Sequence, residues 1–163
     1  MRRELIRKAI QEKPGISYNE LVRNTNLSNG VISHYLIQLL GDKEIKKYGK
    51  TRPKYFLINI EEKDMRIITA LRNQTNNDIC KHLIENSKIC MERGYKNKIL
   101  DAEEISKIIN KSRSTVSVSV RILQKFNIID RVIMNEKSKL TSDIGYAILN
   151  RDKWLNFLSK YKL

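Results

Sequence analysis

The sequence predicts a mainly α-helical protein of the α+β class, built from two tandem units that each end in a small β-hairpin. The first observation is a helix-turn-helix pattern that occurs twice, 84 residues apart and without a gap. The second is a pair of short β-prone segments joined by a turn after each copy. The domains are expected at residues 1–62 and 63–163. Aligned pairs include Glu20 with Glu104, Ser28 with Ser112, and Leu39 with Leu123.

Three helices are expected in the first unit. Apolar residues at helical spacing predict the first helix over residues 3–12. Ser17 and Glu20 fit a capping box, in which each side chain satisfies a backbone N–H, at the start of a second helix over 18–25. Ser28 is the expected N-cap of a third helix, over 29–40. The expected core-facing residues of the third helix are Ile32, Leu36 and Leu39.

The outward face of the third helix is polar, and the hairpin after it is basic. Strands are expected over 45–48 and 55–60, and five of the nine residues from 46 to 54 are Lys or Arg. Since a DNA major groove admits one helix and cations neutralise phosphates, we expect this unit to bind double-stranded DNA. The candidate DNA-binding residues are Ser28, Asn29, Gly30, Ser33, His34, Gln38, Lys46, Lys47, Lys50, Arg52 and Lys54.

A helix, a helix-turn-helix and a basic hairpin in this order resemble the winged helix-turn-helix transcription regulators of bacteria and archaea, of the MarR-like and ArsR-like kind. The resemblance covers about residues 3–60. It implies that helix 29–40 is the recognition helix in the major groove. It also implies that the hairpin at 49–53 is the wing, which lies against the DNA backbone or the minor groove. The tandem arrangement is not the norm of these families.

The charged residues 61–64 form the joint at which the boundary to the second unit is expected. Residues 65–71 fit either a short helix or a third strand of the first hairpin, and a longer helix is expected over 75–91. The basic stretch 93–98 fits either a phosphate-contacting loop or a solvated one. Asp101 and Glu104 form a second capping box, which predicts a helix over 102–109.

Residues 114–120 carry conflicting signals. Their β-branched, alternating pattern favours a strand, whereas the gap-free match to the first unit favours a recognition helix capped by Ser112. We expect the helix, with Val116, Val120 and Leu123 inward, because packing often overrides propensity. The candidate DNA-binding residues of this unit are Ser112, Arg113, Ser114, Thr115, Ser117 and Arg121.

A second wing, shorter and less basic than the first, is expected over residues 128–140, with its turn at 135–138. Residues 140–147 resemble the leucine-threonine, spaced-glycine signature that follows the wing in MarR-like proteins, which implies a helix capped by Thr141. The usual Asp-x-Arg wing tip of that family is absent here.

The C-terminal helix carries an aromatic stripe at helical spacing. Such a stripe fits either a homodimer interface, which the resembled families favour, or intramolecular packing against residues 76–91. The stripe consists of Trp154, Phe157, Leu158 and Tyr161, together with Leu155.

The formal net charge of +14 attracts polyanions, of which nucleic acid is the commonest in a cell. Residues 1–60 carry 12 Lys and Arg against 5 Asp and Glu, and residues 61–163 carry 20 against 13, so both units are basic. No signal peptide or membrane-spanning apolar run is visible, and two cysteines are too few for a disulfide scaffold. We therefore expect a cytoplasmic, nucleoid-associated protein without a membrane partner.

Catalytic residues, cofactors and metals are not expected, and neither is an enzyme. The glycines are scattered, and His34 and His82 lack a paired carboxylate or nucleophile. Cys80 and His82 point apart on a helix, so with Cys90 they form a poor metal site.

The expected function is sequence-specific DNA binding by a transcription regulator. One alternative is an architectural protein that coats DNA. Another is a winged-helix module that binds protein in transcription or chromosome machinery, which suits the small side chains Ser114, Ser117 and Ser119 of the second unit.

Overall fold

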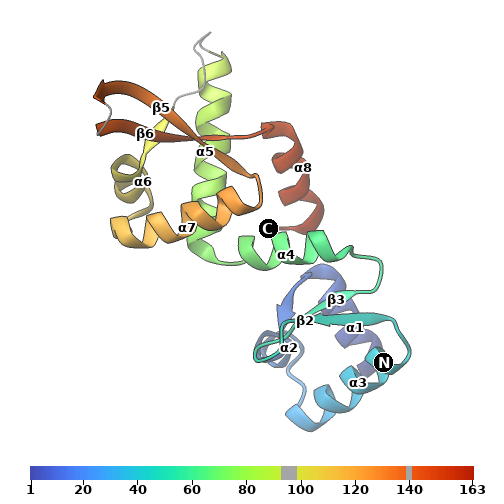
Figure 1. Cartoon of the computed structure of the whole chain (residues 1–163). Helices are drawn as coiled ribbons and strands as arrows, with labels where there is room; N and C mark the ends of the chain where they lie inside the picture. The colour runs from blue at the N-terminus through green and yellow to red at the C-terminus, as the bar shows by residue number, and fades with distance from the viewer. Residues whose placement is uncertain (93–98, 139–140) are drawn as a thin grey trace. The chain divides into compact units, whose positions relative to one another are not determined.

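The computed structural model of the chain describes residues 1–92, 99–138 and 141–163 (Figure 1). The chain divides into two compact units, one of Met1–Thr69 with Tyr161–Leu163 and one of Ala70–Lys160. Both consist of helices and one small antiparallel sheet, so the chain is mainly helical and of the α+β class, as the sequence predicts.

The first unit contains a three-stranded sheet and the helices that cover it. Strand β3 lies between β1 and β2, and it pairs Tyr55 with Ile16 and Leu57 with Ile45. Residues 65–71, for which the sequence left a helix or a strand open, are helical. The elements in order are α1 (Arg2–Glu12), β1 (Ile16–Ser17), α2 (Tyr18–Thr25), α3 (Asn29–Gly41), β2 (Ile45–Tyr48), β3 (Lys54–Leu57) and α4 (Glu62–Leu71).

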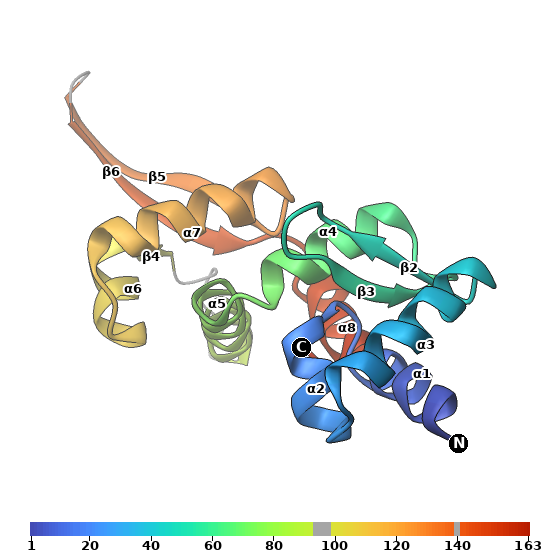
Figure 2. The same ribbon diagram turned by 90° about the horizontal axis from the view of Figure 1, so that it is seen from below.

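The second unit repeats the order from β1 to β3, and its central strand is β6. Strand β6 pairs with β4 through Leu100 and Tyr146, and with β5 along most of its length. Figure 2 shows the β5–β6 hairpin running alongside α7. The elements in order are α5 (Gln74–Glu92), β4 (Leu100–Asp101), α6 (Ala102–Ile109), α7 (Arg113–Lys125), β5 (Ile129–Ser138), β6 (Thr141–Ile148) and α8 (Arg151–Tyr161).

The core of the first unit joins all three of its leading helices to the sheet. Burying each of these large apolar side chains contributes roughly 1.5–3 kcal/mol, which is why the short helices are stable here. Arg3 also ties α1 to the α3–β2 connection, with ion pairs of 2.6 Å to Asp42 and 2.7 Å to Glu44. The core residues are Ile6, Ile10, Ile16, Leu21, Ile32, Leu36, Leu39, Ile45 and Tyr55.

Both expected capping boxes are present, at Ser17 with Glu20 and at Asp101 with Glu104. The two helices that they start also end alike. Asn26 and Asn110 close them in the left-handed conformation, with φ of 53° and 51°, which asparagine tolerates better than most residues. The turn between the two helices of each pattern is therefore encoded in the same way in both units.

Helix α7 resolves the conflict over residues 114–120 in favour of the helix. Val116, Val120 and Leu123 are buried, whereas Val118 is 58% exposed. This burial follows the helical period of 3.6 residues and differs from a strand, in which Val116 and Val118 would share a face. Packing of one apolar stripe thus outweighs the β-propensity of the segment.

The second hairpin differs from the prediction in two ways. It is longer than the first, with strands of 10 and 8 residues against 4 and 4, and the expected turn at 135–138 lies within β5. Residues 141–148 form β6, so the helix capped by Thr141 is wrong. As the central strand, β6 pairs with the backbone of both β4 and β5, and these two strands would lose their partner if residues 141–148 formed a helix.

The aromatic stripe of α8 is packed within the chain. Trp154, Leu158 and Tyr161 are buried, and the Tyr161 hydroxyl donates a 2.6 Å hydrogen bond to the Asp64 carboxylate. Phe157 is half-buried and lies edge-to-face on Trp154, with the ring centroids 5.6 Å apart. Most of the stripe is therefore packed within the chain, and only Leu155, 44% exposed, leaves a large apolar side chain on the surface. The homodimer through this helix stays a prediction.

Candidate nucleic-acid interface

Helix α3 presents the polar surface that the sequence predicts. Ser28 stands at its N-cap position, although its side chain makes no capping hydrogen bond. The His34 ring is 3.1 Å from the amide nitrogen of Gln38, measured from Nε2, so these two side chains are neighbours one turn apart. Six predicted site residues are exposed here: Ser28, Asn29, Gly30, Ser33, His34 and Gln38.

Tyr18, the first residue of α2, positions the start of α3. Its hydroxyl donates to the Asn29 carbonyl oxygen at 2.8 Å and lies 3.0 Å from the Ser33 hydroxyl. Its ring packs against the core of the unit. This residue was not among the sequence candidates, because its role depends on a contact between two helices rather than on a local pattern.

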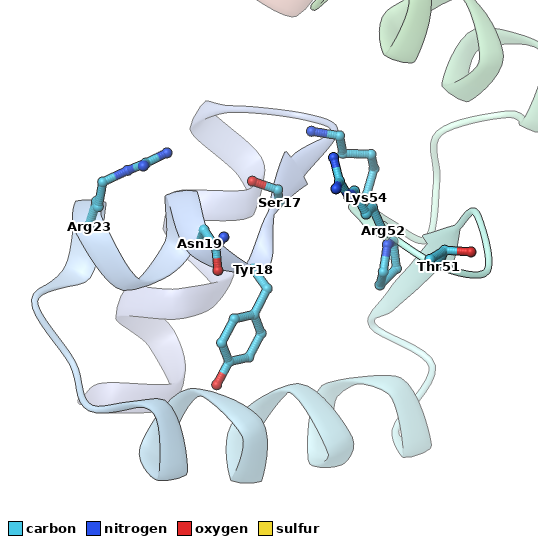
Figure 3. A pocket seen from close by; sticks show the side chains of 8 residues that line it. Ser17, Tyr18, Asn19, Arg23, Thr51, Arg52 and Lys54 are labelled. Atoms are coloured by element: carbon cyan, nitrogen blue, oxygen red, sulfur yellow. The ribbon is translucent and has the colours of Figure 1, made fainter.

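A hollow of about 610 Å³ lies between the start of α2 and the loop that joins β2 to β3. Figure 3 shows Arg23 on one side of it and Arg52 with Lys54 on the other, while Tyr18 points toward α3. Its rim therefore combines cations with hydroxyl groups, which are the groups that contact phosphates in protein–DNA complexes. The lining residues are Ser17, Tyr18, Asn19, Arg23, Thr51, Arg52, Pro53 and Lys54.

All five carboxylates of residues 1–60 are paired with cations. Glu20 accepts from the Ser17 backbone at 2.9 Å and forms ion pairs with Lys13 at 2.8 Å and Lys54 at 3.7 Å. The charge of Lys54 is thus partly neutralised within the chain, whereas the sequence suggested a lysine free to contact phosphate. The other pairs are Glu4 with Arg7, Glu12 with Lys8, Asp42 with Arg3, and Glu44 with Arg3 and Arg7.

Seven cations of the same stretch, all of it within the described residues, have no carboxylate at ion-pair distance. Four of them lie on the hairpin, where Lys47, Lys50 and Arg52 are exposed and Lys46 is half-buried. Arg23 lines the hollow. The net charge of this stretch is therefore concentrated on a few free side chains. The seven are Arg2, Arg23, Lys43, Lys46, Lys47, Lys50 and Arg52.

The second unit offers a weaker version of this surface. Its serine hydroxyls bond to one another, with 2.9 Å between Ser112 and Ser114, and Arg113 approaches Glu103 at 3.8 Å. Val118 stands at the repeat position of His34, so an apolar group replaces a polar one. Residues 93–98, the basic stretch considered as a phosphate loop, lie outside the described residues. All six candidates are exposed: Ser112, Arg113, Ser114, Thr115, Ser117 and Arg121.

Cys80 and His82 lie apart, as expected of residues two positions apart on a helix. Cys80 is buried, and desolvation raises the pKa of its thiol from 9.0 to about 12, although nearby Lys81 opposes the shift. His82 is exposed. Within the described part of the chain, no three His, Cys, Asp or Glu side chains gather in a way that would hold a metal ion. Nor does any helix described there have the length and apolar character to cross a membrane.

Comparisons with known proteins give a weak structural similarity. No protein-family model and no curated protein matches it. Among solved structures, it is similar to the DIP2311 protein from Corynebacterium diphtheriae, with 12% sequence identity and a TM-score of 0.30. The alignment covers 91% of this chain and 26% of that one, so the chain spans about a quarter of that protein's length.

Proposed function

We propose that the chain is a sequence-specific double-stranded DNA-binding protein that regulates transcription, and that its two units are winged-helix domains. The observation that carries this proposal is the surface of the first unit. There an exposed polar helix face adjoins, through Tyr18, a hollow whose rim holds free cations. The repeated element order supports the second domain.

Helix α3 has the size and chemistry of a recognition helix. Its 13 residues span about 20 Å, and a B-DNA major groove about 12 Å wide accepts one helix. Ser33, His34 and Gln38 can each donate and accept hydrogen bonds, so they suit the mixed donor and acceptor edges of base pairs.

The β2–β3 hairpin suits the role of a wing. Lys50 and Arg52 stand on its loop without ion pairs among the described residues, so a phosphate would displace no protein carboxylate from them. Such contacts position a protein on DNA and strengthen binding to every sequence alike. Recognition by α3 and grip by the hairpin would thus be separable by mutation.

We expect the Arg52→Gln variant to weaken binding to cognate and random duplexes by the same factor. Each phosphate contact releases counterions, so the negative slope of log affinity against log salt should become shallower by about 0.9 when one contact is lost. Fluorescence anisotropy titrations at several salt concentrations measure this slope. A selection from a random duplex pool with the full chain supplies the cognate sequence.

The matched control is Lys8→Gln, which removes the same charge from α1, where Lys8 is paired with Glu12. Its salt slope should equal that of the parent protein. Equal slopes for all three proteins would contradict the assignment of the wing. Absence of any salt-sensitive duplex binding would overturn the proposed function as a whole.

A protein partner is a second candidate function for the second unit only. Val118 and Ile108 are 58% and 44% exposed there, whereas the aligned positions of the first unit hold His34 and Asn24. Apolar side chains on the surface suit protein contacts better than phosphate contacts. A hybrid protein, with the first unit on DNA and the second on a partner, agrees with both observations.

A further inference from the structure

We infer that Ile37 recognises the methyl group of a thymine in the DNA major groove, and that the bound sequence contains an A·T pair at that position. This inference rests on the proposed function, because it requires that α3 enter the major groove. It goes further by assigning a base to one side chain. The sequence analysis named only polar and basic candidates on this helix.

Ile37 lies on the outward face of α3. It follows the buried Leu36 by one residue, which rotates it about 100° away from the core. It also stands four residues after Ser33 and three after His34, so these three side chains are neighbours on one exposed face. Ile37 is 71% exposed, more than any other large apolar residue of the described chain except Met1.

The polar neighbours of Ile37 on α3 lead to the cationic hollow. Ser33 shares a 3.0 Å contact with the Tyr18 hydroxyl, and Tyr18 lines the hollow together with Arg52. A continuous surface therefore runs from free cations, through hydroxyl groups, to this single apolar side chain. That order matches DNA, whose phosphates lie at the groove edge and whose base edges lie between them.

A thymine methyl is the apolar group that such a surface can meet. In the major groove, the C5 methyl of thymine is the apolar feature among hydrogen-bond donors and acceptors on the four base pairs. A protein partner fits less well, since a stable interface buries about 800 Å² on each side, and Ile37 is the one exposed large apolar residue of α3, all of which the structure describes. The free cations of the same unit also favour a polyanion over a protein surface.

The test uses the full chain and its selected duplex. Each thymine is replaced in turn by deoxyuridine, which pairs identically but lacks the methyl group. One buried CH₂-sized group contributes about 0.8 kcal/mol, so we expect about fourfold weaker binding at one position. Ile37→Ala should bind the thymine and uracil duplexes equally, and it should lose about as much affinity for the thymine duplex as uracil substitution costs the parent.

The control variant is Ile58→Ala, which shortens another exposed isoleucine of the same unit, 50% exposed and outside α3. It should keep the fourfold preference for thymine. The inference is overturned if no uracil substitution weakens binding, if Ile37→Ala keeps the same preference, or if Ile37→Ala changes the oligomeric state by light scattering. In each of these cases salt-sensitive, sequence-selective binding by the parent would leave the proposed function standing, whereas its absence would remove both.

Discussion

Tyr18 shows how one side chain can align the proposed recognition helix. Its hydroxyl contacts the Asn29 carbonyl and the Ser33 hydroxyl, both in the first turns of α3, while its ring packs against the core. A polar residue that contacts a base edge must be held within a fraction of an ångström to discriminate. In the proposed complex with DNA, Tyr18 would position Ser33 rather than contact the base.

Tyr18→Phe keeps the ring and removes the hydroxyl. We expect a loss of at most about 1 kcal/mol in the free energy of unfolding, since both hydrogen bonds are exposed to solvent. The ratio of cognate to random-duplex affinity should fall by a larger factor than stability alone explains. Urea denaturation and duplex titration measure the two effects. Tyr48→Phe, a half-buried tyrosine of β2, is the control and should change neither.

Local patterns predicted the two capping boxes that start α2 and α6, because capping depends on neighbours in sequence. Ser17 with Glu20 and Asp101 with Glu104 are therefore as expected. The partner of Lys54 could not be predicted in this way. Its 3.7 Å contact with Glu20 depends on the pairing of β1 with β3, which brings together residues far apart in the chain.

Helix α7 forms despite a strand-like sequence, and substitutions of two of its valines test how it packs. Val116→Ala should lower the free energy of unfolding by about 2 kcal/mol, because it leaves a cavity in the core. Val118→Ala should raise it by up to about 0.5 kcal/mol, since alanine is the better helix former at an exposed site. Chemical denaturation measures both. Similar losses for both variants would indicate that the valines share a face, as in a strand.

The helix predicted after the second hairpin is wrong. Residues 140–147 resemble a signature that is helical in another family, yet here they form β6. Two strands flank β6, and one of them, β4, comes from about forty residues earlier in the chain. Local sequence cannot report such a partner. The choice for residues 65–71 was open for the same reason, since their apolar pattern is compatible with either type of packing.

The two units share the positions of their buried core residues and differ in their exposed surfaces. Buried Ile32 and Leu39 align with buried Val116 and Leu123, so the core of the repeat could be predicted from the alignment. The outward positions differ, as His34 and Val118 illustrate. The structure divides between Thr69 and Ala70, which assigns most of α4 to the first unit, whereas the sequence places the boundary at residue 62.

This asymmetry predicts that the first unit dominates DNA binding. The double variant Lys50→Gln with Arg52→Gln should make the slope of log affinity against log salt shallower by about 1.8, because two phosphate contacts are lost. The matched variant Arg113→Gln with Arg121→Gln removes the same charge from the second unit, where Arg113 is close to Glu103. Its slope should become shallower by less than half as much. Equal decreases would show that both units hold the duplex with similar numbers of contacts.

The free cations of the first unit also have a kinetic consequence. Because none of the seven is engaged with a carboxylate among the described residues, no ion pair has to open before a phosphate is bound. In the proposed function, encounter with DNA would then be governed by diffusion and by the attraction between opposite charges, which speeds association at low salt. Arrival would be nearly as fast on any duplex. Discrimination between sequences would therefore lie in the residence time, which contacts made by α3 prolong only at a matching site.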